Sequence, residues 1–209
     1  MNYDRYCNQN ERNYNRKTLS YYLMRKPPDK ILIPYVSGIC NKKVLEVGIG
    51  YGYYTRYYMD NCNKVKGIDV NPSLGKDLDI EVAYGLANKL KETVKEKFDY
   101  IVSFFMTEYL SYEEMKEFIG QGILLLNDGG RFVTTVIQKR GLGRLYILFA
   151  RMRGIKKYNY SMEEIYSMIE KEKEISINIL PLDTVMKIPF ASLVEIEKSE
   201  EKKLAKEPC

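Results

Sequence analysis

The chain has 209 residues, 45% of them hydrophobic and 29% charged, which is the composition of one globular domain large enough for a complete core. Its formal net charge of +5 is modest for a dedicated nucleic-acid-binding protein, and no apolar run reaches the ~20 residues of a membrane-spanning helix. The four cysteines lack C-x-x-C spacing, histidine is absent and the first residues are polar, so we expect a cytoplasmic protein without a bound metal or an export signal.

Residues 1 to 42 are predicted to form a helical cap ahead of the first strand. Apolar residues recur there at helical spacing until Pro27-Pro28, which is expected to end the first helix. A second, short helix is expected from Asp29 to Tyr35.

An apolar run that begins at Val44 leads into Gly48, Gly50 and Gly52. It predicts a buried parallel strand, a glycine turn and then a helix, an arrangement in which the backbone can lie against a nucleotide-like ligand. The third glycine comes one place earlier than in the G-x-G-x-x-G turn of dinucleotide-binding proteins. Glu46 would repel a pyrophosphate but attract an ammonium or sulfonium group. S-adenosylmethionine is therefore the favoured ligand, and a turn without a ligand is the alternative.

The next strands continue an alternation of strands and helices. Val65 to Ile68 form the second strand and end in Asp69, which is placed to accept hydrogen bonds from ribose hydroxyls or, alternatively, to cap a short helix. The third and fourth strands are expected at residues 80–84 and 98–103, with a charged helix over residues 87–95 between them. Such alternation is typical of an α/β protein with a parallel sheet.

The second half of the chain carries two helix-start signals. Ser111 with Glu114, and Ser161 with Glu164, each have capping-box spacing. The last two strands are expected at residues 175–180 and 191–196, and the charged tail from 198 to 209 is expected to be flexible.

The chain resembles the class I S-adenosylmethionine-dependent methyltransferases over residues 43–137. The resemblance rests on the glycine turn, the acid after the second strand, the Phe98-Asp99 start of the fourth strand, and Leu124 to Val133. That last segment is similar to the family's L-x-P-G-G pattern, with Asp128 in place of proline. The resemblance implies an α/β, Rossmann-like, seven-stranded and mostly parallel sheet with helices on both faces and the last strand antiparallel. Residues 1–197 would form a single methyltransferase domain.

The family's cofactor-binding residues can be carried over by position. Gly48, Gly50 and Gly52 would lie beneath the methionine part of S-adenosylmethionine, and Glu46 would reach its amino group. Asp69 would hold the ribose. The remaining positions of the expected cofactor site follow the second, third and fourth strands: Val70, Leu86, Ala87, Ser103 and Phe104.

Three of these positions carry reservations. Leu86 stands where the family often has an acid that accepts from the adenine amino group, so backbone groups or Asn88 would have to substitute. For Val70 and Phe104, the alternative interpretation is that each is a simple core residue.

The sulfonium is already an activated methyl donor, so a base is needed only for a weakly nucleophilic acceptor. Glu108 and Tyr109, after the fourth strand, are the weak candidates for catalysis. For Glu108, a solvent-exposed position ahead of the Ser111 helix is the favoured interpretation.

Residues 139–157 contain seven basic residues and no acid, interleaved with apolar residues, and they lie in an insert over residues 138–160 near the expected acceptor site. The insert suggests an anionic membrane surface, an acidic or lipid-like acceptor, or RNA phosphates. A helix that covers the sheet edge with a solvated basic face is an equal alternative. Residues 103–106 lack the (N/D)-P-P-(Y/F) element of methyltransferases that act on nucleobase amino groups. We therefore expect methyl transfer to a small molecule of acidic or lipid-like character. An RNA methyltransferase and a non-catalytic binding subunit of the same fold remain the other hypotheses.

Overall fold

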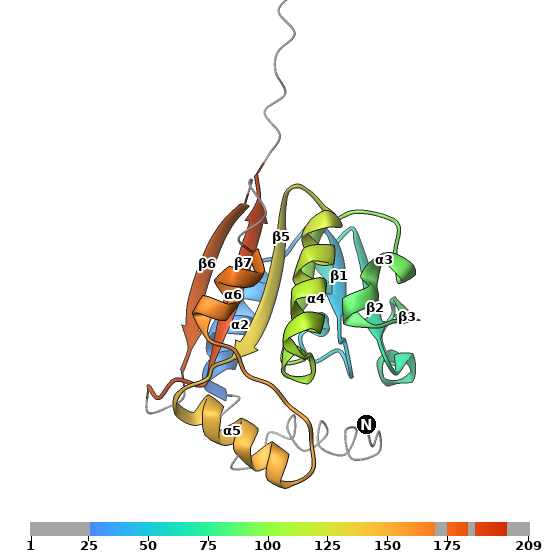
Figure 1. The fold of residues 1–209 in the computed structure, drawn as a ribbon. Helices are drawn as coiled ribbons and strands as arrows, with labels where there is room; N and C mark the ends of the chain where they lie inside the picture. The colour runs from blue at the N-terminus through green and yellow to red at the C-terminus, as the bar shows by residue number, and fades with distance from the viewer. Residues whose placement is uncertain (1–25, 170–174, 184–186, 200–209) are drawn as a thin grey trace, which may run out of the picture.

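The computed structural model describes residues 26–169, 175–183 and 187–199, which form a seven-stranded sheet flanked by helices. The strand order is β3-β2-β1-β4-β5-β7-β6 (Figure 1). The pairs within β1 to β5 are parallel, whereas β7 runs antiparallel to both β5 and β6. The predicted α/β architecture and its antiparallel last strand are confirmed.

The strands are β1 (Lys43–Val47), β2 (Lys64–Asp69), β3 (Glu81–Tyr84), β4 (Phe98–Ser103), β5 (Leu126–Ile137), β6 (Ile175–Leu182) and β7 (Ala191–Lys198). The α-helices are α2 (Lys26–Ser37), α3 (Leu90–Thr93), α4 (Tyr112–Leu124), α5 (Gly141–Met152) and α6 (Met162–Ile169). Short 3₁₀ turns are η2 (Thr55–Tyr57), η3 (Met59–Asn61), η4 (Pro72–Gly75), η5 (Ala87–Lys89) and η6 (Thr107–Tyr109).

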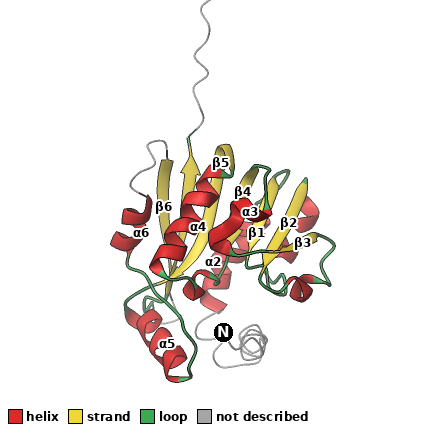
Figure 2. Cartoon of the chain, turned by 45° about the vertical axis from the view of Figure 1, so that its right-hand side comes forward, coloured by secondary structure: helices red, strands yellow, loops and turns green. Residues whose placement is uncertain are grey.

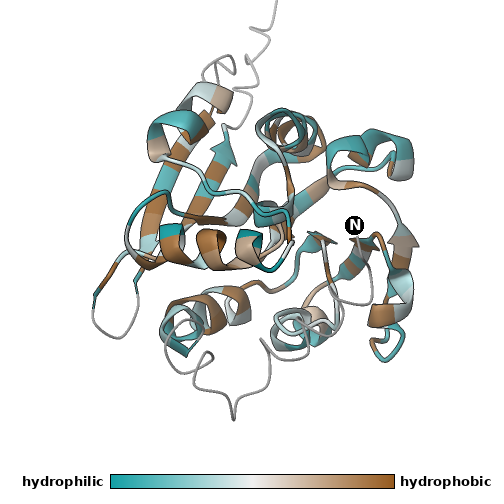
Figure 3. Ribbon diagram, turned by 60° about the horizontal axis from the view of Figure 1, so that its bottom comes forward, coloured by the Kyte–Doolittle hydropathy of each residue, from teal (hydrophilic) through white to brown (hydrophobic). Residues whose placement is uncertain are grey.

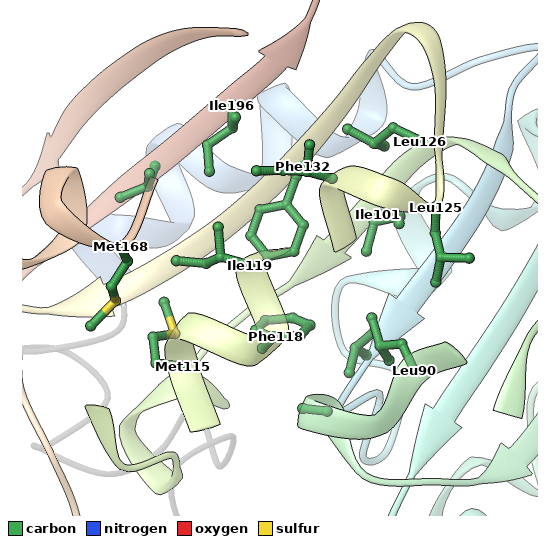
Figure 4. Packing of buried hydrophobic residues seen from close by; sticks show 14 of the residues in the cluster. Leu90, Ile101, Met115, Phe118, Ile119, Leu125, Leu126, Phe132, Met168 and Ile196 are labelled. Atoms are coloured by element: carbon green, nitrogen blue, oxygen red, sulfur yellow. The ribbon is translucent and has the colours of Figure 1, made fainter. Parts of the chain in front are cut away.

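Helices cover both faces of the sheet (Figure 2). Successive side chains of a strand point to opposite faces, so Leu45 and Ile101 enter one core while Val44 and Val102 enter the other. The first core packs against α3, α4 and α6 (Figure 4), and the second against α2 and the tyrosines that follow the glycine turn. The central strands β1, β4, β5 and β7 are therefore buried on both sides, whereas the edge strands β3 and β6 are more exposed.

The first core depends on a close approach between α4 and β5. The rings of Phe118 and Phe132 are 5.0 Å apart, centroid to centroid. A Cβ added to Gly122 would lie 2.4 Å from the Phe132 ring, so only glycine fits at that turn of α4. Both predicted capping boxes are present: Ser111 and Ser161 each exchange hydrogen bonds with the glutamate three residues on.

Two predicted helices differ from the structure. The segment after the glycines is a series of turns and 3₁₀ helices, not an α-helix, and the helix predicted over residues 87–95 is only η5 followed by one turn of α3. Pro27 and Pro28 lie in the first turn of α2, where a missing backbone donor costs little. The helix predicted before them lies outside the described residues. Residues 1–25 of the predicted cap and 200–209 of the predicted tail lie outside the described residues.

Within the described ranges, none of the helices has the length and apolar character needed to cross a bilayer. The same residues hold no cluster of three acidic or cysteine side chains suited to a metal ion.

Candidate active site

The sequence-predicted site residues meet at one edge of the sheet. Val47 pairs with Ile68 and Glu46 with Val102, so the carboxyl ends of β1, β2 and β4 lie side by side. In open parallel sheets this edge is where ligands bind. Figure 3 views the molecule with this edge turned forward.

The glycine turn after β1 has one open position and two packed ones. Gly48, Gly50 and Gly52 all have positive φ, at 74°, 52° and 68°. A Cβ on Gly48 would lie 2.3 Å from Met106 Cγ, and one on Gly52 would lie 2.4 Å from Leu78 Cδ1. A Cβ on Gly50 would meet nothing within 4 Å. A ligand can therefore approach the backbone at Gly50.

Glu46 is a buried carboxylate held by two hydroxyl groups. Its Oε2 accepts hydrogen bonds from Thr55 Oγ1 at 2.6 Å and from Tyr58 Oη at 2.5 Å. Desolvation raises the pKa of Glu46 to about 7, although the two hydrogen bonds oppose the rise and nearby Asp69 adds to it. No basic side chain is among these hydrogen-bond partners of Glu46 in the described part of the chain.

Asp69 joins the glycine turn to the end of β2. Its Oδ2 accepts from the Gly50 backbone N–H at 2.9 Å, and its Oδ1 accepts from the Asn71 N–H at 2.8 Å. Burial raises the pKa of Asp69 despite these bonds. The cap of η4 is Asn71, whose side chain accepts from Ser73 N–H, and not Asp69. The alternative reading of Asp69 as that helix cap is therefore wrong.

Two apolar side chains beyond β2 and β3 are exposed at the same edge. Val70 is 43% and Leu86 39% exposed, so Val70 is not the core residue that the alternative interpretation assumed. Ala87 is buried. The Asn88 side-chain amide donates a hydrogen bond to Glu117 Oε2 at 2.8 Å.

Ser103 and Phe104, at the end of β4, are both buried. Ser103 Oγ has no hydrogen-bond partner among the residues that the structure describes. The Phe104 ring lies 4.9 Å from the Tyr54 ring, centroid to centroid, and belongs to the second core. The next residue, Phe105, has a φ of 53°, an uncommon conformation for an aromatic residue, and donates its N–H to Thr135 Oγ1.

Glu108 is buried, contrary to the solvent-exposed position favoured from the sequence, because the insert folds over it. Only 3% of the residue is exposed. Its Oε1 lies 3.4 Å from Lys157 Nζ and accepts a hydrogen bond from Tyr146 Oη at 3.4 Å. Lys157 is fully buried and lies over the rings of Tyr109 and Tyr146, at 4.5 and 4.6 Å. Local sequence patterns do not mark Lys157 and Tyr146 as site residues, because only the fold of the insert brings them to Glu108.

Helix α5 carries an exposed apolar stripe. Its members recur at helical spacing and are 46% to 71% exposed: Leu145, Leu148, Phe149 and Met152. The opposite face buries Ile147 and Ala150. The helix lies beyond the carboxyl end of β5, below the sheet in Figure 1. Because it has one buried face and one exposed apolar stripe, the insert is neither wholly basic nor wholly solvated.

Residues 45–134 match the family described as a methyltransferase domain. A comparison with curated proteins found no match. Among solved structures, the magnesium protoporphyrin IX methyltransferase of Synechocystis PCC 6803 with bound S-adenosylhomocysteine superposes with a TM-score of 0.69 at 14% identity, over 94% of each chain.

Two further structures are similar over most of the chain. The N-methyltransferase NodS of Bradyrhizobium japonicum, in complex with S-adenosylhomocysteine, has a TM-score of 0.65 at 18% identity, over 92% of this chain and 98% of that one. An S-adenosylmethionine-dependent methyltransferase of Clostridium acetobutylicum has a TM-score of 0.64 at 14% identity, over 94% and 99%. These likenesses establish the shared fold.

Proposed function

This chain carries a class I S-adenosylmethionine-dependent methyltransferase domain over residues 45–134, and on that premise we propose that it methylates a small-molecule acceptor bound near α5. The domain establishes the enzyme class and the cofactor. The acceptor and the residues of the site are what we propose. One observation carries the proposal: the backbone at Gly50 is open to a ligand, next to the buried carboxylates of Glu46 and Asp69.

In the proposed site, the cofactor's methionine part lies against the backbone at Gly50. Gly48 and Gly52 keep the turn in place through their contacts with Met106 and Leu78. The Glu46 carboxylate attracts the ammonium group, directly or through a water molecule. Burial makes that attraction stronger than it would be at an exposed site.

The nucleoside part would lie at the ends of β2 and β3. Asp69 already accepts two backbone hydrogen bonds, and its oxygens have lone pairs left for the ribose hydroxyls. The exposed side chains of Val70 and Leu86 offer apolar contacts to the adenine ring, and the backbone of Leu86 and Ala87 replaces the missing acid.

Ser103 and Phe104 would border the methionyl chain. Ser103 Oγ is buried without a partner, and a buried hydroxyl without a hydrogen bond is costly, so a polar ligand atom at this position would satisfy it. Phe104 is proposed to contribute apolar packing behind the chain.

The cofactor supplies a methyl group on a positively charged sulfur, which becomes neutral when the methyl leaves. The protein's own contribution is to align an acceptor with the S–CH₃ bond and to exclude water. The buried rings of Tyr54, Phe104 and Phe105 lie behind this edge of the sheet and exclude water from it.

The acceptor is proposed to be amphipathic, acidic or lipid-like. Helix α5 places an apolar stripe at the carboxyl edge of the sheet, and Arg144, Arg151 and Arg153 accompany it. Such a combination favours the interface of an anionic bilayer. We therefore propose peripheral membrane contact through residues 139–157.

Residues 1–197 would form one methyltransferase domain with residues 138–160 as its insert. Cys40 and Cys62 are free thiols, which supports a cytoplasmic location.

The test follows an isotope-labelled methyl group from S-adenosylmethionine into fractionated cell extract. We expect the label in the small-molecule or lipid fraction with the wild-type protein and not with Gly50→Arg, whose side chain would fill the ligand's approach. Label in RNA would support the nucleic-acid alternative instead. Cofactor binding without any transfer would support the non-catalytic alternative.

A further inference from the structure

Two buried side-chain oxygens have no hydrogen-bond partner within the described part of the chain, one on the last residue of β4 and the other on η6 just beyond it. They are Ser103 Oγ and Glu108 Oε2, five residues apart. Native proteins pair nearly all such atoms, and an unpaired one commonly marks a place where a ligand or water binds. The proposed cofactor site accounts for Ser103 but not for Glu108.

The surroundings of Glu108 hold its other oxygen firmly. Oε1 contacts the Lys157 ammonium and the Tyr146 hydroxyl, and these two groups also contact each other. The Glu108 backbone carbonyl accepts from Tyr158 N–H at 2.7 Å, which fixes the end of the insert against η6. The carboxylate is therefore oriented by the insert, with one oxygen engaged and the other not.

A purely structural ion pair does not explain this arrangement. A buried pair compensates its desolvation only when the remaining lone pairs are also hydrogen-bonded. Leaving a buried polar group unsatisfied costs about 1–3 kcal/mol, and more when it is charged. Lys157 balances the charge of Glu108, yet Oε2 remains without a donor. A group that carries an N–H or O–H would fill that position.

The location of η6 relates Oε2 to the proposed cofactor site. Met106, two residues before Glu108, packs against Gly48 so closely that a Cβ there would overlap it. Thr107 Oγ1 donates to the Thr135 carbonyl at 2.6 Å, which fastens the same turn to the carboxyl end of β5. Glu108 thus lies on the turn that adjoins the glycine turn, between it and the insert.

We propose that Glu108 Oε2 binds the reacting group of the acceptor, and that this group is a hydroxyl or an amine with a hydrogen to donate. The inference rests on the proposed methyltransferase function and narrows its substrate class. Lys157 and Tyr146 act as positioning residues because they hold Oε1 and so aim Oε2. An acidic or lipid-like part of the same acceptor would extend toward the arginines and the apolar stripe of α5.

The test measures fragment binding to the protein saturated with S-adenosylhomocysteine. The probes are phenol and benzylamine, which have a hydrogen to donate, and anisole, which is phenol with that hydrogen replaced by methyl. We expect phenol or benzylamine to bind the wild type at least tenfold more tightly than anisole does. Equal affinities, or no binding of either donor probe, would overturn the proposal.

Variants separate this role from a structural one. Glu108→Gln replaces a charged hydrogen-bond acceptor with a neutral one and should weaken donor-probe binding about tenfold. The affinity for S-adenosylhomocysteine should stay within twofold. Glu113→Gln, an exposed acid at the start of α4, is the matched control and should change neither. Unchanged probe binding in Glu108→Gln would contradict the proposal.

A second variant covers the case in which Glu108→Gln does not fold. Glu108→Met combined with Lys157→Met replaces the buried pair by apolar residues of similar volume, an exchange that proteins often tolerate. It should keep cofactor binding and lose the preference for phenol over anisole, and retention of that preference would overturn the proposal. Failure of the wild type to bind S-adenosylhomocysteine would instead contradict the proposed function itself.

Discussion

The backbone N–H of Gly50 donates a hydrogen bond to Asp69 Oδ2 over 2.9 Å, so the turn after β1 is joined directly to the end of β2. The residue proposed to hold the ribose therefore also fixes the turn proposed to receive the methionine part. A change at Asp69 is expected to affect both parts of the cofactor, and a change at Gly50 is expected to disturb the Asp69 carboxylate.

Replacing Asp69 with alanine should weaken S-adenosylmethionine binding by at least tenfold, because the ribose loses its hydrogen-bond acceptor and the glycine turn loses its anchor. Calorimetric titration measures the effect. Asp60→Ala, at an exposed position on η3, is the control and should bind like the wild type. Equal affinities of the Asp69 and Asp60 variants would contradict the assignment of Asp69.

The affinity for S-adenosylmethionine should rise with pH between 6 and 8. The pKa of Glu46 is raised to about 7 by burial, so the carboxylate that attracts the ammonium is largely protonated at pH 6 and ionised at pH 8. Titrations at three pH values measure the trend, and Glu46→Gln should flatten it. If the affinity depends on pH in the same way in the wild type and in Glu46→Gln, the titration of Glu46 is not the cause.

The stability of the cofactor-free protein should change with pH in the opposite sense. Native Glu46 holds its proton up to about pH 7, whereas the unfolded carboxyl loses it near 4.5, so unfolding releases a proton between these values. The free energy of unfolding should fall as pH rises through this window, by roughly 3 kcal/mol in full. Urea unfolding of the wild type and Glu46→Gln at pH 5 and pH 8 checks the difference.

Alanine substitutions at Gly50 and at Gly52 should distinguish an effect on cofactor binding from an effect on the stability of the fold. Gly52→Ala forces a Cβ into Leu78 and should destabilise the protein by about 2–4 kcal/mol, through overpacking and the positive φ together. Gly50→Ala meets no protein atom, so it should cost only about 1–2 kcal/mol while reducing cofactor affinity. Gly120→Ala, on α4 with open space around it, is the control and should be neutral or stabilising.

Much of the fold could be predicted from local patterns. The central strands β1 and β4 show as apolar runs, β6 shows as an alternation of apolar and polar residues, and Ser111 and Ser161 mark their helices through spacing alone. The helix predicted after the glycines failed for a tertiary reason. Thr55 and Tyr58, in and just after η2, both donate to the buried Glu46 carboxylate of β1. A local helical pattern in the sequence does not record these tertiary hydrogen bonds.

The buried environment of Glu108 could not be predicted from the neighbouring sequence either. The glutamate looks like a surface residue ahead of a capping box, and its partner Lys157 lies 49 residues further along in a run of basic residues. Only the fold of the insert over η6 brings the two together. The common location of the proposed cofactor residues could be predicted because each lies at or just beyond the carboxyl end of a strand, and parallel strands bring these ends to one edge.

Vesicle binding tests the role proposed for α5. Phe149→Glu places a charge in the apolar stripe and should reduce binding to vesicles of phosphatidylcholine and phosphatidylglycerol by at least tenfold. Binding of the wild type should weaken as salt screens the arginines. Tyr166→Glu, exposed on α6, is the control for an added surface charge. Wild-type binding that is equally strong to neutral vesicles would contradict the electrostatic part of the proposal.

Calorimetric titration of the purified protein with S-adenosylmethionine and S-adenosylhomocysteine, for the wild type and Gly50→Arg, tests the central claim most directly. The account predicts micromolar binding of both ligands to the wild type and none to the variant, with the variant still folded by circular dichroism. Absence of binding at millimolar ligand, or equal binding to both proteins, would contradict it.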